Sequence, residues 1–156
     1  MNPSASLYII GNGFDLYHDI PSDYRDFGRY LAAVDRGTYR EVEAYFNVDN
    51  EFWWQSEQQL ANFNTCAAID YASQFLMPYG ADIWSDSGHH DYQYELDRII
   101  EAISKTLQER FAQWVRQLSI PSLSSCNTAP LPLDPNALYL SFNYTNTLQR
   151  TYGIPD

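Results

Sequence analysis

The chain has very little positive charge. It contains nine Lys and Arg residues against 20 Asp and Glu residues, and Lys105 is its single lysine. A formal net charge of −11 in 156 residues repels nucleic-acid backbones and anionic membrane surfaces. We therefore expect neither sequence-independent binding to DNA or RNA nor association with a membrane surface.

Cysteine and long apolar runs are also scarce. Cys66 and Cys126 stand alone, without CxxC spacing, so we expect both to be reduced and structural. No stretch reaches the ~18 apolar residues that a membrane-spanning helix needs. The N-terminus has neither the basic segment nor the long apolar segment of a signal peptide. By elimination, the sequence indicates a cytoplasmic protein.

Aromatic residues, in contrast, are abundant. They make up 16% of the chain, which argues against disorder, and 156 residues are enough for one domain with a sizeable core. We expect a single α/β domain over 1–156, with a helical block over 22–118 and a loop over 119–136. The loop is rich in proline, serine and threonine. We interpret it as a surface connection or, alternatively, as a mobile lid.

The spacing of apolar residues predicts several helices. The first should be capped by Ser22 and end at Gly37, and the last should be capped by Thr145 or Asn146 and end at Gly153. The apolar stripe of the longest helix indicates a core face or the interface of a homo-oligomer. The predicted helices cover 22–36, 38–46, 51–60, 61–77, 91–118 and 146–152, with a polar loop over 82–90.

Two apolar runs, 7–10 and 137–142, predict strands buried on both faces, as in parallel sheets. Both run straight into polar turns, and parallel neighbours would bring these turns to one edge, where open α/β sheets bind ligands. We predict a parallel Rossmann-like sheet with a large helical insertion between its first and second strands. Two strands are too few for such a sheet. We therefore expect the chain to be truncated at its C-terminus, or further strands to come from elsewhere.

The first turn, Gly11-Asn12-Gly13-Phe14, is a candidate phosphate-binding turn. A strand that ends in Gly-x-Gly can bring backbone N–H groups up to a phosphate, because glycine has no side chain. Leu16 stands where the full dinucleotide fingerprint has a third small residue. The alternative is a turn that merely ends the strand. The candidate nucleotide-binding residues are Gly11, Asn12, Gly13, Phe14, Tyr144 and Thr145.

Asp15, His18 and Asn143 are the candidate catalytic residues. Asp15 could take a ribose hydroxyl, a water or a metal, or it caps the next turn. His18 can act as an acid or base near neutral pH, although a lone loop histidine is more often structural. The Asn143 amide can donate and accept, and its alternative role is in the turn itself. The cluster His89-His90-Asp91 matches no standard metal spacing, so we expect no metal.

Four sequence blocks stand out in combination. They are Ile9-Ile10-Gly11-Asn12-Gly13-Phe14-Asp15-Leu16, Pro21-Ser22-x-Tyr24-x-x-Phe27, Trp54-x-x-Glu57-x-x-Leu60, and Ser141-Phe142-Asn143-Tyr144-Thr145-x-Thr147-Leu148 with Tyr152-Gly153. Together they resemble the AbiH family of bacteriophage abortive infection. The resemblance covers both ends of the chain and most of its middle.

The resemblance implies a role in phage defence. A more distant similarity is to sirtuin-like defence domains that hydrolyse NAD, whose glycine turn corresponds to Gly11 and Gly13 and whose Asn-Tyr-Asp turn corresponds to Asn143 and Tyr144. Thr145 replaces the Asp of that triplet, and the catalytic His-Gly has no counterpart. The AbiH family normally continues to a strand that ends in Ile-His-Gly. The resemblance therefore implies an NAD-type pocket in a chain that is inactive by itself.

Two functions follow from these observations. In the first, the domain binds a nucleotide, NAD foremost, and hydrolyses it when full length. In the second, it is a non-enzymatic sensor or interaction module that recognises a phage or host protein through the aromatic helical block around Trp53 and Trp54. A nuclease would need a carboxylate or histidine cluster with metal spacing, and we find none in the sequence.

Overall fold

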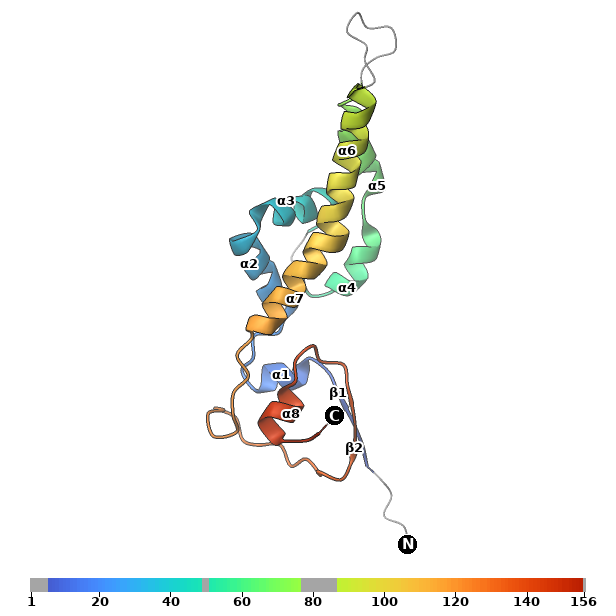
Figure 1. Ribbon diagram of the computed structural model, residues 1–156. Coiled ribbons are helices and arrows are strands. Elements are labelled where there is room, and N and C mark those ends of the chain that lie inside the picture. Colours follow the sequence, from blue (N-terminus) through green and yellow to red (C-terminus); the bar gives the residue numbers. More distant parts are fainter. Residues whose placement is uncertain (1–5, 49–50, 77–86, 156) are drawn as a thin grey trace, which may run out of the picture. The chain divides into compact units, whose positions relative to one another are not determined.

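The computed structural model describes residues 6–48, 51–76 and 87–155. The chain combines helices with a small parallel sheet and divides into two compact units (Figure 1). We call Met1–Asp26 with Gln113–Asp156 the sheet unit, and Phe27–Ala112 the helical unit. Within the described residues, no helix has both the length and the apolar character needed to cross a bilayer.

The sheet consists of β1 (Leu7–Ile10) and β2 (Leu138–Ser141), which pair in parallel with Leu7 opposite Leu138 and Ile10 opposite Ser141. The prediction of parallel neighbouring strands is confirmed. The prediction that both faces are buried is wrong, because Ile9 is 67% exposed whereas Ile10 is 7% exposed. Successive side chains of a strand point to opposite faces, and the unit's core lies on one face alone.

The core of the sheet unit lies between this sheet and two short helices, α1 (Gly13–Tyr17) and α8 (Thr147–Tyr152). Five residues are too few to show helical periodicity, and α1 was not predicted. The predicted end of α8 is confirmed, because Gly153 has φ 68°, the left-handed conformation that favours glycine. The buried residues are Ile10, Leu148 and Ile154, with Phe14, Leu133, Tyr139 and Tyr152 packed against them.

The long connection before β2 is tied to the sheet unit by hydrogen bonds. Thr151 Oγ1 donates to the Pro121 carbonyl at 2.9 Å, and Tyr17 Oη donates to the Ala129 carbonyl at 2.8 Å. Farther along, the Leu131 N–H donates to Tyr152 Oη at 3.0 Å. These anchors favour the interpretation of this segment as a surface connection.

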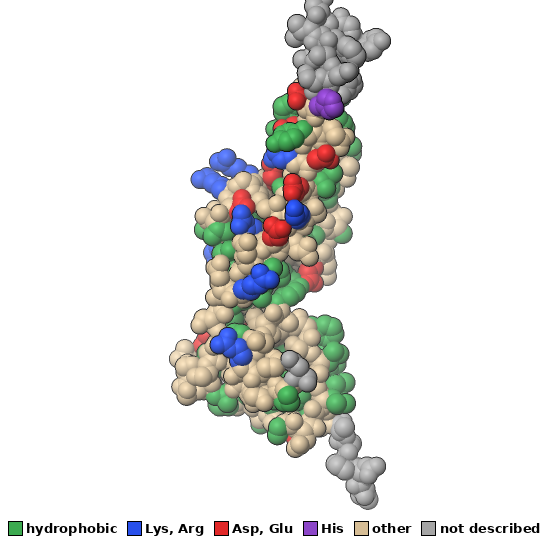
Figure 2. Space-filling model, viewed as in Figure 1, with side chains coloured by type: hydrophobic (Ala, Val, Ile, Leu, Met, Phe, Trp, Pro, Cys, Tyr) green, Lys and Arg blue, Asp and Glu red, His purple; other side chains and the backbone are tan. Residues whose placement is uncertain are grey.

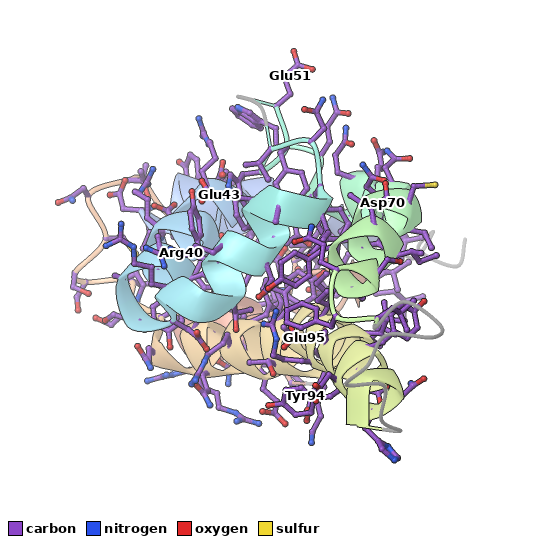
Figure 3. All side chains as sticks on the ribbon, turned by 90° about the horizontal axis from the view of Figure 1, so that it is seen from above. Arg40, Glu43, Glu51, Asp70, Tyr94 and Glu95 are labelled. Atoms are coloured by element: carbon purple, nitrogen blue, oxygen red, sulfur yellow. The ribbon has the colours of Figure 1, made fainter. Side chains whose placement is uncertain are left out.

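The remaining helices follow one another between the strands, and both α2 and α7 have residues in each unit. Figure 3 looks down on them from above and shows Glu51 pointing away from the ribbon. Tyr45, Ala68 and Ile99 form a buried cluster of the helical unit. The elements are α2 (Tyr24–Val34), α3 (Arg36–Tyr45), α4 (Ser56–Gln59), the 3₁₀ helix η1 (Leu60–Asn62), α5 (Thr65–Ser73), α6 (Ser87–Glu101), the π-helical η2 (Ala102–Thr106) and α7 (Leu107–Gln117).

Several predicted helix boundaries are wrong, and three of them show why. Ser22 does not cap a helix, because its hydroxyl donates to Asn12 Oδ1 and α2 begins at Tyr24. Gly37 lies inside α3, whose true N-cap is Asp35. The helix predicted from 61 is interrupted at Asn64, whose Oδ1 accepts from the Ala67 N–H at 3.0 Å and begins α5. In each case a neighbouring polar residue offered an alternative boundary that apolar spacing cannot resolve.

The long predicted helix is present as the continuous run α6, η2 and α7. It begins at Ser87, so the predicted loop is wrong over 87–90, and 82–86 lie outside the described residues. Ile99 is fully buried but Ile100 is 54% exposed. Both belong to the predicted stripe, yet consecutive helical residues point about 100° apart, so one of them leaves the core.

Candidate functional site

The turn after β1 contains the two glycines, and neither is required by the backbone. Among the described residues, Gly153 is the one glycine with a positive φ. A Cβ built on Gly11 or on Gly13 would have no atom within 4 Å other than those of its chain neighbours. The turn therefore needs glycine neither for its conformation nor for packing. Instead the two positions leave open space beside the backbone where α1 begins.

Asp15 connects this turn to the turn after β2. It lies in α1 and is 1% exposed. Asn143 Nδ2 donates to one carboxylate oxygen at 3.0 Å, and Thr145 Oγ1 donates to the other at 2.6 Å. Because the strands are parallel, both turns lie at the carboxyl edge of the sheet, and the buried carboxylate joins them there.

A second threonine extends this network. Thr147 is fully buried, and its Oγ1 lies 2.7 Å from Thr145 Oγ1. Since the Thr145 hydroxyl already donates to Asp15, Thr147 must be the donor in this contact. Hydrogen bonds in such a chain polarise and strengthen one another. At the Asn143 end of this network, the amide Oδ1 is buried and has no hydrogen-bond partner, so it is an unsatisfied acceptor.

Two further contacts hold the exposed rim of this edge. Tyr144 is 57% exposed, and its hydroxyl lies 2.9 Å from that of Tyr24. Asn12 accepts the Ser22 hydroxyl, so its side chain ties the glycine turn to the segment before α2. The turn after β2 is thereby linked to the first residue of α2, and the glycine turn to the segment just before that helix.

His18 lies apart from the carboxylate network and is 2% exposed. Its Nδ1 is 2.6 Å from the Phe14 carbonyl, which can only accept, so Nδ1 carries the proton. In the neutral ring, Nε2 then accepts from Tyr152 Oη at 2.8 Å. The same tyrosine oxygen accepts from the Leu131 N–H. Both ring nitrogens are engaged, and the contacts hold α1, α8 and the connection together.

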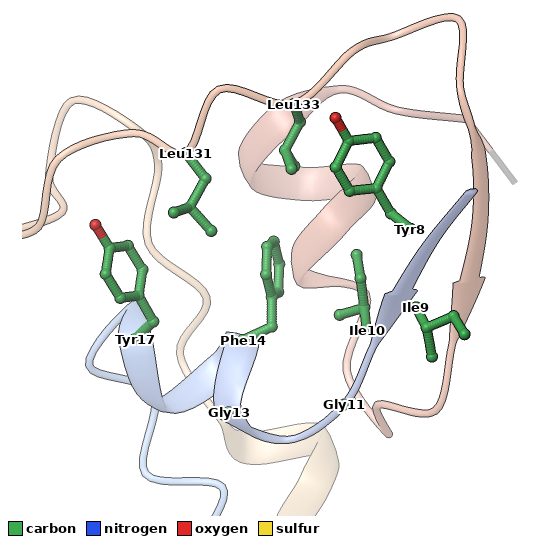
Figure 4. Close-up of a pocket in the computed structure, with 9 residues that line it drawn as sticks. All are labelled: Tyr8, Ile9, Ile10, Gly11, Gly13, Phe14, Tyr17, Leu131 and Leu133. Atoms are coloured by element: carbon green, nitrogen blue, oxygen red, sulfur yellow. The ribbon is translucent and has the colours of Figure 1, made fainter. Parts of the chain in front are cut away.

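A pocket of about 410 Å³ begins at the glycine turn and runs along β1 (Figure 4). Its lining includes no charged side chain. Figure 4 shows Leu131 and Leu133 on the far side of the pocket from β1, with Phe14 between them and the strand. The full lining is Tyr8, Ile9, Ile10, Gly11, Gly13, Phe14, Tyr17, Leu131 and Leu133.

The structure thus brings Asp15, Asn143 and Thr145 into direct contact, next to the turn that holds Gly11 to Gly13. Phe14 belongs to the core, and Tyr144 and Asn12 form the rim. Three partners of these residues were not predicted from the sequence: Thr147, Tyr152 and Ser22. The spacing Thr145-x-Thr147 in a polar turn was the available signal for one of them.

The described residues contain no group of three or more His, Cys, Asp and Glu side chains placed to hold a metal ion. The side chain of His89 lies outside the described part. Cys66 and Cys126 are both free thiols. The polar side-chain groups described at the carboxyl edge of the sheet are a carboxylate, an amide and hydroxyls.

Comparison with known families covers nearly the whole chain. The family model described as "Bacteriophage abortive infection AbiH" matches residues 7–156. The chain belongs to the AbiH family. The match includes both turns of the candidate site and confirms the resemblance seen in the sequence blocks. No curated protein and no solved structure matches the chain.

Proposed function

We propose that this chain is the nucleotide-binding part of a cytoplasmic AbiH protein that acts in abortive infection by bacteriophage. Its two-stranded sheet would be the centre of a Rossmann-like domain. Membership of the AbiH family supports the biological role. The carboxyl edge of the parallel sheet supports the binding role, since open α/β sheets bind their ligands at this edge.

The observation that carries the proposal is the pair of glycines. Gly11 and Gly13 serve neither the backbone conformation nor internal packing, yet both stand in the turn that begins α1. The first amides of a helix have no partner within the helix; in α1 the Phe14 N–H already donates to the Gly11 carbonyl at 2.9 Å, so the amides proposed to bind are those of Gly13 and Asp15. A phosphate that approaches the bare backbone can accept from these amides, which any larger side chain would obstruct.

The polar network gives the other site residues their roles. Asn143 Oδ1 is a buried acceptor without a partner, and a ribose hydroxyl that reached it would supply the missing donor. Asp15 has both oxygens occupied, so it orients Asn143 and does not itself react. His18 is structural, because its two nitrogens are engaged in the core. NAD is the first nucleotide to test, both for binding and for hydrolysis.

The test is calorimetric titration of NAD, and of AMP as a simpler ligand, into the protein and its Gly13→Val variant. We expect at least ten-fold weaker binding by the variant, with an unchanged circular dichroism spectrum. Gly37→Ala, in the helical unit, is the control and should bind as the parent does. Unchanged affinity in Gly13→Val would contradict the proposal, as would a folded parent protein that binds neither ligand.

A second candidate is a non-enzymatic sensor that recognises a phage or host protein. The observation that favours it is Trp54, which is 59% exposed in the helical unit. Large aromatic side chains of this kind are enriched in protein interfaces. Loss of phage protection in Trp54→Ala, in a protein that consumes no NAD and is otherwise normally folded, would favour the sensor over the enzyme.

A further inference from the structure

The contacts of the proposed function do not by themselves distinguish a nucleotide from a simpler ligand. In that function the glycine turn binds a phosphate through backbone amides, and Asn143 Oδ1 accepts from a ribose hydroxyl. Ribose 5-phosphate carries both of these groups. A nucleotide differs from it by an aromatic base, so a residue that selects a nucleotide must contact the base.

Tyr144 is an exposed aromatic residue in the turn after β2. It stands between Asn143 and Thr145, whose side chains donate to the two carboxylate oxygens of Asp15. Asp15 is 1% exposed, whereas Tyr144 is 57% exposed. The chain is therefore anchored by buried contacts on both sides of Tyr144, while much of the tyrosine side chain is accessible to a ligand.

The ring of Tyr144 is restrained by Tyr24, the first residue of α2. The two hydroxyl oxygens lie 2.9 Å apart, and the rings meet edge to face, with their centroids 6.4 Å apart and their planes at 74°. A hydrogen bond and an aromatic contact thus act on the same ring. Because the ring is already restrained, little side-chain entropy is lost when a ligand stacks on it.

The segment that contacts Tyr144 also holds the glycine turn. The Ser22 hydroxyl donates to Asn12, and Tyr24 contacts Tyr144 only two residues later in the chain. Two residues span at most about 7 Å of backbone. All of these residues belong to the sheet unit. Tyr144 and the glycine turn therefore meet this segment at neighbouring positions and lie on the same rim.

An aromatic contact suits a surface with little charge. On the face drawn in Figure 2, few charged side chains lie over the sheet unit. The net charge of −11 also opposes the binding of a phosphate by charge alone. Stacking of a neutral base on an aromatic ring adds affinity without positive charge, and every base has a π face that can stack.

We propose that Tyr144 stacks on the base of the bound ligand and thereby makes the site select a nucleotide over a sugar phosphate. This inference rests on the proposed function, which supplies the phosphate and ribose contacts. The contact is made by the aromatic ring and not by the hydroxyl. Phenylalanine can therefore replace Tyr144, whereas alanine cannot.

Calorimetric titration of AMP and of ribose 5-phosphate tests the contact, because the base is present in the first ligand alone. We expect the protein to bind AMP about ten-fold more tightly than ribose 5-phosphate. Tyr144→Ala should lower the affinity for AMP to that for ribose 5-phosphate and leave the latter unchanged. Tyr144→Phe should bind AMP within about three-fold of the parent, since it keeps the ring.

Two further variants serve as controls. Phe142 is 67% exposed and stands two residues before Tyr144, so Phe142→Ala removes a comparable ring next to the same turn. This variant should keep the parent's preference for AMP. Gly13→Val should instead weaken both ligands, because it obstructs the phosphate that they share. Circular dichroism checks that each variant folds.

The outcomes separate this inference from the proposed function. Equal affinity of the parent for AMP and ribose 5-phosphate would overturn the inference and leave the phosphate-binding turn in place. An affinity for AMP that Tyr144→Ala does not change would also overturn it, as would Tyr144→Phe binding AMP as weakly as Tyr144→Ala. A folded parent protein that binds neither ligand would overturn the proposed function and, with it, the inference.

Discussion

Asp15 is a carboxylate whose surroundings determine its role. It is nearly inaccessible to solvent and accepts one hydrogen bond at each oxygen, from residues of the turn after β2. Hydrogen bonds to charged groups contribute more than neutral ones, and a buried donor without a partner is costly. We conclude that Asp15 first of all holds the two turns of the candidate site together.

Replacing Asp15 by Asn should destabilise the protein by about 1–3 kcal/mol, because the amide keeps one acceptor and places a donor against a donor. Asp19→Asn is the matched control. Asp19 is an exposed residue with φ 57°, a conformation that asparagine tolerates, so its replacement should change little. Urea unfolding of both variants measures the difference, and equal unfolding free energies would contradict the proposed role of Asp15.

Replacement by alanine should have opposite effects on stability at two glycines of the helical unit. A Cβ on Gly28 would lie 2.7 Å from Trp53 Cε2, well inside van der Waals contact. On Gly37, inside α3, it would lie 3.5 Å from Asp35 Oδ1, an ordinary contact. Packing therefore requires glycine at the first position, while the second merely lowers helix propensity.

Gly28→Ala should destabilise the protein by about 1–3 kcal/mol through overpacking against Trp53. Gly37→Ala should stabilise it by about 0.5–1 kcal/mol, because alanine is the better helix former. Thermal unfolding monitored by circular dichroism compares the two. A lower melting temperature for Gly37→Ala, or a higher one for Gly28→Ala, would show that the packing at these positions is misassigned.

At the scale of the element, the start of α3 depends on Asp35. Its Oδ1 accepts from the Thr38 N–H at 3.0 Å, and its other oxygen pairs with Arg110 Nε at 2.8 Å. The hydrogen bond from the Thr38 backbone, aided by Arg110, lowers the pKa of the Asp35 carboxyl below its ordinary value of about 3.8. The cap is therefore strongest when Asp35 is ionised.

The sign of the pH dependence follows from the lowered pKa. The stabilisation by Asp35 is fully present above the pKa of the unfolded chain and is lost as the pH falls through the lower pKa of the folded state. Asp35→Ala should cost about 1 kcal/mol at pH 7 and less near pH 3. Urea unfolding of both proteins at the two pH values measures this, and a difference that grows at low pH would contradict it.

At the scale of the whole molecule, the charge is the dominant property. A net charge of −11 makes the compact state repel itself, and salt screens charges over about 10 Å at 0.1 M. We expect the melting temperature to rise between 0.02 and 0.5 M sodium chloride. Asp70→Lys, at an exposed position of α5, should reduce that rise. A melting temperature that falls with salt would show that ion pairs such as Arg98–Glu41 outweigh the repulsion.

Much of the architecture could be predicted because it depends on local patterns. The two strands, their parallel pairing, the long helix and the glycine end of α8 follow from apolar periodicity and turn chemistry. Boundaries set by side-chain caps could not be predicted, since Ser22, Asp35 and Asn64 offer the same chemistry and differ in what they meet after folding.

For the candidate site, the sequence by itself determined which residues stand in the two turns and that both turns follow strands. It also determined the AbiH membership, which the family comparison confirms. The tertiary structure decided what those residues do. Asp15 meets Asn143 and Thr145 across more than 120 positions of sequence, and His18 meets Tyr152. Such partners depend on how the chain returns to the sheet, and that is a property of the packed fold which no local pattern contains.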